Sequence, residues 1–295
     1  MLTPNSRLER YNARFPRGAY FLDPHRRFLL CAIPKSGCSS LKRWFLALTD
    51  PAEADTPDIH RYCHTTHSLI RHWRKPPDLF CFTMVRDPLR RLASAFSDKF
   101  IARFRTGCFE GAREIMEAAA RARGLPVNFD REETIILDGA PTRVRSSSDV
   151  DYDRGVTFRE FIRLICSAPD RCLDSHWRPM SSFLKGQRVD FIGRLDHLAA
   201  DLGAVSDLLD LPRPARHFPP ADHAPVADTL ASGDPGALAD IPSGDLFRAG
   251  ILPGAADLFD ERLTQLVRSR FAADFELVRT AGVLPQRPHP AALVP

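Results

Sequence analysis

Two short apolar runs, each followed by apolar positions at helical spacing, dominate the chain. Residues 27–33 (Arg-Phe-Leu-Leu-Cys-Ala-Ile) are bounded by Pro34, and residues 79–85 (Leu-Phe-Cys-Phe-Thr-Met-Val) lead into Arg86. Continuous apolar runs of this length are typical of strands buried on both faces of a mainly parallel sheet. We therefore predict an α/β fold in which these two strands are central and helices cover both faces.

A helix is predicted directly after each strand. Apolar residues recur at helical spacing over 41–48, and Ser39 or Ser40 is predicted as the N-cap. After the second strand, Pro88 suits the first turn of a helix and Asp87 suits its cap. Both segments therefore have the order strand, tight loop, helix.

Further along, the pattern predicts four more helices and two irregular stretches. Thr157 and Glu160 form a capping box at the start of one helix. We predict these helices over 112–123, 157–165, 195–211 and 256–271, a variable insertion over about 103–156, and a Pro/Gly-rich loop over about 212–255. Residues 1–26 are predicted as an N-terminal extension, 27–284 as one domain and 285–295 as a frayed tail.

The loop after the first strand carries residues that suit an anion. A helix start bears about half a positive charge and favours a bound anion. Gly37 allows close approach of the backbone, and Lys35 adds a mobile positive charge. The order differs from the nucleotide P-loop, in which the lysine follows the second glycine. The alternative is a turn whose polar residues only cap the helix.

A second candidate site follows the second strand. Arg86 stands at the carboxyl end of that strand, where ligands bind open α/β sheets. Ser94 lies two turns into the following helix, and an arginine fork with a hydroxyl can jointly hold a phosphate. Alternatively, Arg86 forms a surface salt bridge and Ser94 is a small packed residue.

These two segments resemble motifs of the carbohydrate sulfotransferases. Residues 34–43 resemble their 5′-phosphosulfate loop, and residues 85–96 resemble their 3′-phosphate segment. Residues 176–180 (His-Trp-Arg-Pro-Met), with 190–198 downstream, are similar to a block of the chondroitin and dermatan type. Met180 stands where that block usually has glutamine.

The resemblance covers roughly residues 27–200, with a weaker match at 271–277, and is to a bacterial-like soluble member of sulfotransferase family 2. It implies a P-loop-like three-layer sandwich and an enzyme that uses 3′-phosphoadenosine 5′-phosphosulfate (PAPS). The enzyme would transfer the sulfuryl group in line to a hydroxyl of a carbohydrate or glycolipid acceptor, releasing 3′-phosphoadenosine 5′-phosphate (PAP). The implied cofactor-binding residues are Lys35, Ser36, Gly37, Cys38, Ser39, Ser40, Arg86 and Ser94. Lys35 would also act catalytically, by neutralising the leaving phosphate.

Histidine is the residue type expected to act as general base. An acceptor hydroxyl must lose a proton during transfer, and a neutral imidazole suits that role near pH 7. The resemblance to heparan sulfate 2-O-sulfotransferases leads to His67 or His64 between the two motifs, with His67 slightly favoured. His176 is a third candidate. A metal site at these histidines and an ordinary solvated loop are the alternatives, and no metal is required by the proposed chemistry.

Composition limits the remaining possibilities. The 295 residues are 44% hydrophobic and carry a net charge of +4 (41 basic minus 37 acidic), too small an excess to indicate nucleic acid. No apolar run approaches the roughly 18 residues needed to span a bilayer. Seven cysteines without a C-x-x-C pair favour reduced thiols. We therefore expect a cytoplasmic protein, or one peripheral at the inner membrane.

Two other classes of function are open at this point. A P-loop kinase-like phosphotransferase would need an acidic Mg²⁺ ligand at a strand end, and Asp87 is the nearby candidate. A non-catalytic binding protein with the same fold is the other. It would be indicated by loss of Lys35 or of the histidines between the motifs, and neither is lost.

Overall fold

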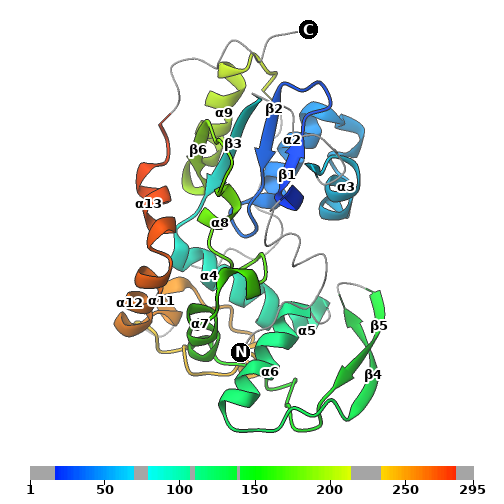
Figure 1. Ribbon diagram of the computed structural model, residues 1–295, viewed down its shortest axis with the longest axis vertical. Helices are drawn as coiled ribbons and strands as arrows, with labels where there is room; N and C mark the ends of the chain where they lie inside the picture. Colours follow the sequence, from blue (N-terminus) through cyan, green and yellow to red (C-terminus); the bar gives the residue numbers. More distant parts are fainter. Residues whose placement is uncertain (1–16, 70–78, 107–109, 138–139, 214–233, 284–295) are drawn as a thin grey trace. The chain divides into compact units, whose positions relative to one another are not determined.

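The structure, a computed structural model, describes residues 17–69, 79–106, 110–137, 140–213 and 234–283 (Figure 1). Within these ranges the chain divides into two compact units. The sheet unit contains residues 17–87, 178–213 and 273–283, where described. The second unit contains residues 88–177 and 234–272, again where described. No helix in these ranges is both long and apolar enough to cross a membrane.

The sheet unit is built on a mixed sheet with a parallel centre. Among the described residues, four strands lie in the order β1 (Tyr20–Leu22), β2 (Phe28–Cys31), β3 (Phe80–Val85), β6 (Phe191–Arg194). Strands β2, β3 and β6 are parallel, and β1 pairs antiparallel with β2. The strands predicted at 27–33 and 79–85 are thereby confirmed as the two inner strands of a mainly parallel sheet.

Helices cover both faces of this sheet, as predicted. Alternate strand residues point to opposite faces, so Phe28 and Leu30 join one apolar cluster while Leu29 and Cys31 join the other. One face is packed by α2 (Cys38–Thr49), α3 (Ile59–Thr66) and α9 (Leu198–Leu208). The other face is packed by α8 (Ser181–Leu184) and α13 (Ala272–Thr280).

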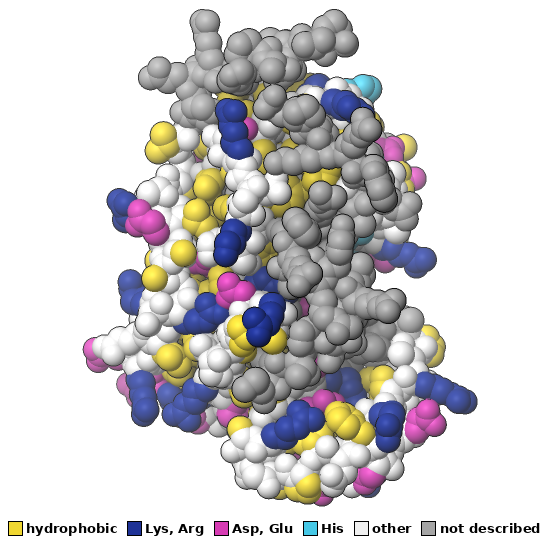
Figure 2. Space-filling model, viewed as in Figure 1, with side chains coloured by type: hydrophobic (Ala, Val, Ile, Leu, Met, Phe, Trp, Pro, Cys, Tyr) yellow, Lys and Arg dark blue, Asp and Glu magenta, His cyan; other side chains and the backbone are white. Residues whose placement is uncertain are grey.

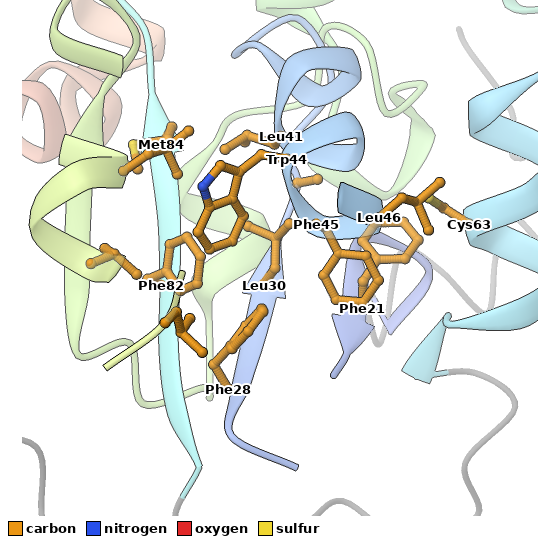
Figure 3. Packing of buried hydrophobic residues seen from close by; sticks show 14 of the residues in the cluster. Phe21, Phe28, Leu30, Leu41, Trp44, Phe45, Leu46, Cys63, Phe82 and Met84 are labelled. Carbon is orange, nitrogen blue, oxygen red and sulfur yellow. The ribbon is translucent and has the colours of Figure 1, made fainter. Parts of the chain in front are cut away.

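Aromatic packing fixes α2 on the sheet. The Trp44 ring lies 5.7 Å from the rings of both Phe28 and Phe82, measured between centroids. Phe45 extends the cluster towards Phe21, on β1 (Figure 3). Burial of each such side chain stabilises the fold by about 1.5–3 kcal/mol. The helix axis, and with it the position of the helix start, is therefore set by the core.

The second unit is mainly helical. Its elements are α4 (Pro88–Phe96), a π-helical turn (Ser97–Ile101), α5 (Arg103–Thr106), α6 (Glu110–Ala122), β4 (Arg131–Leu137), β5 (Ala140–Ser146), α7 (Phe158–Ser167), α10 (Ser243–Arg248), α11 (Ala255–Leu258) and α12 (Glu261–Arg270). Its core is aromatic: Trp177, 1% exposed, packs against Phe100 and Phe161. The capping box of Thr157 and Glu160 is confirmed at the start of α7.

Some elements differ from the predictions for local reasons. The helix expected over 256–271 is divided into α11 and α12, because the Asp260 carboxylate accepts from Leu263 N–H and starts a new helix. The predicted insertion over 103–156 contains the antiparallel pair β4–β5, which we did not predict. The predicted loop over 212–255 contains α10 in its described part, and residues 214–233 lie outside the described residues.

A buried carboxylate near the end of the described chain holds α8 in place. Asp274 on α13 is 1% exposed, and it accepts hydrogen bonds from the N–H groups of Met180 (2.7 Å) and Ser181 (2.9 Å). These N–H groups belong to the start of α8, where no partner exists within the helix. Asp274 therefore joins α13 to the segment that carries Met180.

We predict that Asp274→Ala lowers the free energy of unfolding by about 1–3 kcal/mol, because two buried N–H groups lose their acceptor. Asp274→Asn should recover part of this loss, since one amide oxygen can still accept. Urea denaturation monitored by circular dichroism measures both. Glu276→Ala is the matched control on α13, because its pair with Arg279 is exposed to solvent. An Asp274→Ala protein as stable as this control would contradict the assignment.

Candidate functional site

The loop between β2 and α2 has an unusual backbone. Lys35 (φ 64°) and Gly37 (φ 80°) both lie in the left-handed region. The N–H of Ser36 closes a tight turn onto the carbonyl of Ile33 at 3.2 Å. A lysine in the left-handed region is uncommon, and such conformations cluster at ligand sites. The loop thus holds Lys35 in a conformation that its own sequence does not favour.

The start of α2 is not capped by a side chain, so the predicted N-cap was wrong. Gly37 is the N-cap residue, and Ser39 and Ser40 lie inside the first turn. The first backbone bond of the helix joins Leu41 N–H to the Gly37 carbonyl at 2.9 Å. The N–H groups of residues 38–40 therefore have no partner within the helix, which is the arrangement that favours an anion.

A side chain at position 37 would not fit. A Cβ atom built on Gly37 would lie 2.6 Å from Leu195 Cδ1, in addition to the strain of its left-handed φ. Glycine is therefore required for close packing against the segment that follows β6 as well as for the turn. The loop and the downstream motif are in direct contact.

Three segments distant in sequence meet at the carboxyl edge of the sheet. The loop follows β2, Arg86 follows β3 and Leu195 follows β6. Arg86 Nη1 donates to the Lys35 carbonyl at 3.3 Å, and Ser36 Oγ lies 3.4 Å from Met180 Sδ. The carboxyl edge of parallel strands is where open α/β sheets bind their ligands.

A buried lysine lies behind the loop. Lys42 on α2 is 3% exposed, and its Nζ lies 2.9 Å from His60 Nδ1 and 3.2 Å from His64 Nε2. Its ammonium also lies 5.0 Å from the centre of the Phe21 ring. Burial lowers the pKa of Lys42. Lys42 was not among the residues selected from the sequence, although its spacing of three from Phe45 places it on the buried face of the helix.

The three candidate bases occupy different environments. His67 is 6% exposed, and its ring packs 5.1 Å from Phe45 and 6.1 Å from Tyr62, between centroids. His64 keeps an exposed edge, yet desolvation of its ring and the charge of Lys42 lower its pKa to about 4. His176 Nδ1 lies 2.7 Å from Asp174 Oδ1, and both side chains are partly buried.

The predicted site residues are distributed over both units. Lys35, Ser36, Gly37, Cys38, Ser39, Ser40 and Arg86 come together around the loop in the sheet unit. Ser94, on α4, and His176 belong to the second unit. There Arg91, 1% exposed, donates to the Ser175 carbonyl at 3.2 Å and so holds the loop that carries His176.

The described part of the surface in Figure 2 carries charges of both signs. On the described part of the face in Figure 2, Lys and Arg side chains are interspersed with Asp and Glu. Among the described residues, no group of three or more His, Cys, Asp or Glu side chains is placed to hold a metal ion. Six cysteines in those ranges are free thiols.

The parallel-centred sheet and its strand–loop–helix unit define an α/β protein in which a helix start without a side-chain cap lies at the carboxyl edge of the sheet. Comparison with known families then shows that the chain belongs to the sulfotransferase family, whose model matches residues 18–277. This confirms the resemblance drawn from the three motifs.

Several curated proteins are similar to the chain. Human carbohydrate sulfotransferase 14 is 27% identical over 203 residues, which is 65% of this chain and 46% of that protein. The zebrafish (Danio rerio) protein of the same name is 27% identical over 206 residues, 67% of this chain and 49% of that protein. Human carbohydrate sulfotransferase 8 is 26% identical over 206 residues, which is 65% of this chain and 43% of that protein. The chain thus aligns with somewhat less than half of each relative. No solved structure matches significantly.

We predict that His64 makes stability depend on pH between about 6.5 and 4. In that window the unfolded chain binds a proton at position 64 that the folded chain does not, because folding lowers the pKa to about 4. The free energy of unfolding should therefore decrease as the pH is lowered from 7 to 5. The decrease should be smaller in the His64→Gln variant, which has no imidazole at this position. Urea titrations of both proteins at pH 7 and pH 5 measure this. Equal pH dependence in the two proteins would contradict it.

Proposed function

We propose that this protein transfers the sulfuryl group of PAPS to a hydroxyl of a carbohydrate or glycolipid acceptor. The single observation that carries the proposal is the start of α2 at the carboxyl edge of the sheet, which no side chain caps and which directly follows Lys35 and Gly37 in their left-handed turn. Membership of the sulfotransferase family supports it, as do relatives whose names specify carbohydrate sulfotransferases. On this proposal the fold is P-loop-like, with residues 27–284 as the catalytic domain.

The residues of the loop fit the nucleotide. PAPS supplies an activated sulfuryl group attached to its 5′-phosphate. Lys35 and the helix N–H groups would stabilise the negative charge that grows on that phosphate as the sulfur–oxygen bond breaks, and this electrostatic effect requires no metal. Ser36, Ser39 and Ser40 would add hydroxyl contacts, and Cys38 lines the same turn. Gly37 would let the backbone approach closely.

We assign binding of the 3′-phosphate of the nucleotide to Arg86 and Ser94, in line with the resemblance of residues 85–96. Arg86 already donates to the Lys35 carbonyl, so its guanidinium lies beside the loop. A guanidinium binds phosphate with paired N–H donors, which fixes the nucleotide without taking part in the bond change. Ser94 would supply the second contact from α4.

His176 is the histidine best suited to be the general base. The reaction forms a bond from the acceptor oxygen to sulfur, and the hydroxyl proton must pass to a base. Asp174 beside Nδ1 favours the tautomer that is protonated at Nδ1, which leaves Nε2 as the acceptor nitrogen. His64, with a pKa of about 4, is a weak base, and His67 is packed among aromatic rings. We therefore propose His176, ahead of His67 and His64, as the general base.

We also propose that the protein acts in the cytoplasm or at the inner membrane surface.

We predict micromolar binding of PAP without metal, measured by isothermal titration calorimetry. Arg86→Ala should weaken this binding about 10-fold or more, because a charge-assisted contact to the 3′-phosphate is lost. Arg248→Ala is the control, since its guanidinium is exposed in a pair with Asp245 in the second unit. Binding of ATP with Mg²⁺ in place of PAP would overturn the proposal in favour of a kinase-like phosphotransferase. Failure to bind either nucleotide would indicate a fold retained for another purpose.

We predict that His176→Ala lowers turnover by about 10²–10⁴-fold while PAP affinity stays unchanged. Turnover is measured as PAP released from PAPS with desulfated chondroitin, dermatan and bacterial polysaccharides as acceptors. Lys35→Ala, which should abolish turnover through the leaving group, is the reference for full loss. Full activity in His176→Ala, together with loss in His67→Gln or His64→Gln, would move the base to the segment between the motifs.

A further inference from the structure

The hydroxyl of Ser39 is connected to a buried lysine through one imidazole ring. Lys42 Nζ lies 2.9 Å from His60 Nδ1, and His60 Nε2 lies 2.9 Å from Ser39 Oγ. Lys42 is 3% exposed and sits on the second turn of α2, whereas His60 is exposed on α3. This chain of contacts runs from the core outwards to the first turn of α2, and the transfer chemistry proposed above does not explain it.

The chemistry of the lysine fixes the direction of these hydrogen bonds. An amino group that contacts two imidazole nitrogens, on His60 and His64, acts as donor to both. His60 Nδ1 is then the acceptor nitrogen of a neutral ring, and its proton resides on Nε2. His60 Nε2–H therefore donates to Ser39 Oγ. The low pKa of His64, which shares the same lysine, is consistent with neutral rings in this cluster.

The bond from His60 determines what Ser39 can offer to a ligand. A hydroxyl has one proton to donate, and Ser39 accepts from His60 on one side. Its own O–H is thereby left to donate away from the ring. Ser39 lies in the first turn of α2, beside the N–H groups that have no partner within the helix.

We propose that Lys42 and His60 are positioning residues that hold the Ser39 hydroxyl as a donor to the 5′-phosphate of the bound nucleotide. The inference rests on the proposed function, because it names the ligand of the same loop. It differs in assigning a role to two residues that are not among the cofactor-binding residues named from the sequence. Neither residue touches the nucleotide, and both act through Ser39.

A purely structural link between α2 and α3 is the competing explanation, and it predicts different behaviour. Such a link would affect folding and every ligand equally. A positioning role would affect only ligands that carry a 5′-phosphate. Since His60 is exposed, its replacement should leave the core of the sheet unit intact.

The test is calorimetric titration of four proteins with PAP and with adenosine 3′-phosphate, which lacks the 5′-phosphate. The proteins are the unaltered chain, His60→Ala, Ser39→Ala and the double variant. His60→Ala should weaken PAP binding roughly 5- to 20-fold and leave adenosine 3′-phosphate binding unchanged. The double variant should bind PAP no more weakly than Ser39→Ala, because His60 acts through that hydroxyl.

Two further variants sharpen the result. His60→Gln offers an amide N–H to Ser39 and should recover part of the PAP affinity. His25→Ala removes an exposed imidazole elsewhere in the sheet unit and should bind PAP as the unaltered chain does. Nitrogen-15 spectra of the imidazole rings should show His60 neutral and protonated at Nε2.

Several outcomes would overturn the inference. These are unchanged PAP affinity in His60→Ala, an equal loss for both nucleotides, or additive effects in the double variant. If the unaltered chain binds no PAP, the proposed function fails and the inference fails with it. If the unaltered chain binds PAP, and the His60 variants bind it as tightly as the His25→Ala control does, the proposed function stands. The positioning role of Lys42 and His60 alone is then wrong.

Discussion

The arrangement around the candidate site depends on one helix end that is fixed in place without a cap. The left-handed turn through Lys35 and Gly37 directs the chain into α2, and the N-cap residue, Gly37, has no side chain to cap the helix. The first N–H groups of the helix retain their partial positive charge at the carboxyl edge of the sheet. The position of this charge is determined by core packing, because the Trp44 and Phe45 rings pack α2 against β2 and β3 (Figure 3). Core packing and the electrostatics of the site are therefore parts of the same construction.

Much of the sheet unit could be predicted from sequence, and the reason is local. Residues 28–31 and 80–85 are apolar without interruption, and buried parallel strands have that pattern. The capping box of α7 was predictable because both partners lie within one helical turn. The N-cap of α2 was predicted wrongly, because preference favours serine, whereas contact with Leu195, more than 150 residues away, requires glycine. Long-range packing of this kind leaves no local signal.

The polar cluster behind the loop was also beyond sequence analysis, in part for the same reason. Lys42 carries a charge, which ordinarily favours solvent, and its partners His60 and His64 come from a different helix. The β4–β5 pair was missed because its described strand residues are largely exposed, and β4 in particular lacks an alternation of buried and exposed positions. The candidate bases illustrate a further limit. His64, His67 and His176 are the same residue type, and only their neighbours, Lys42, Phe45 and Asp174, separate them chemically.

The bond from Asp274 to Met180 has a consequence for the synthesis of the protein. Met180 contacts Ser36 in the loop, and Met180 is held by a carboxylate that lies 94 residues further along the chain. On the ribosome, the strand, loop and first helix emerge early, but the last support of the loop is translated only with α13. A nascent chain that stops before this helix would expose the apolar face formed by Cys31, Val85 and Phe183. Completion of the loop between β2 and α2 is therefore tied to completion of α13, so truncated products are expected to bind chaperones through this exposed apolar face.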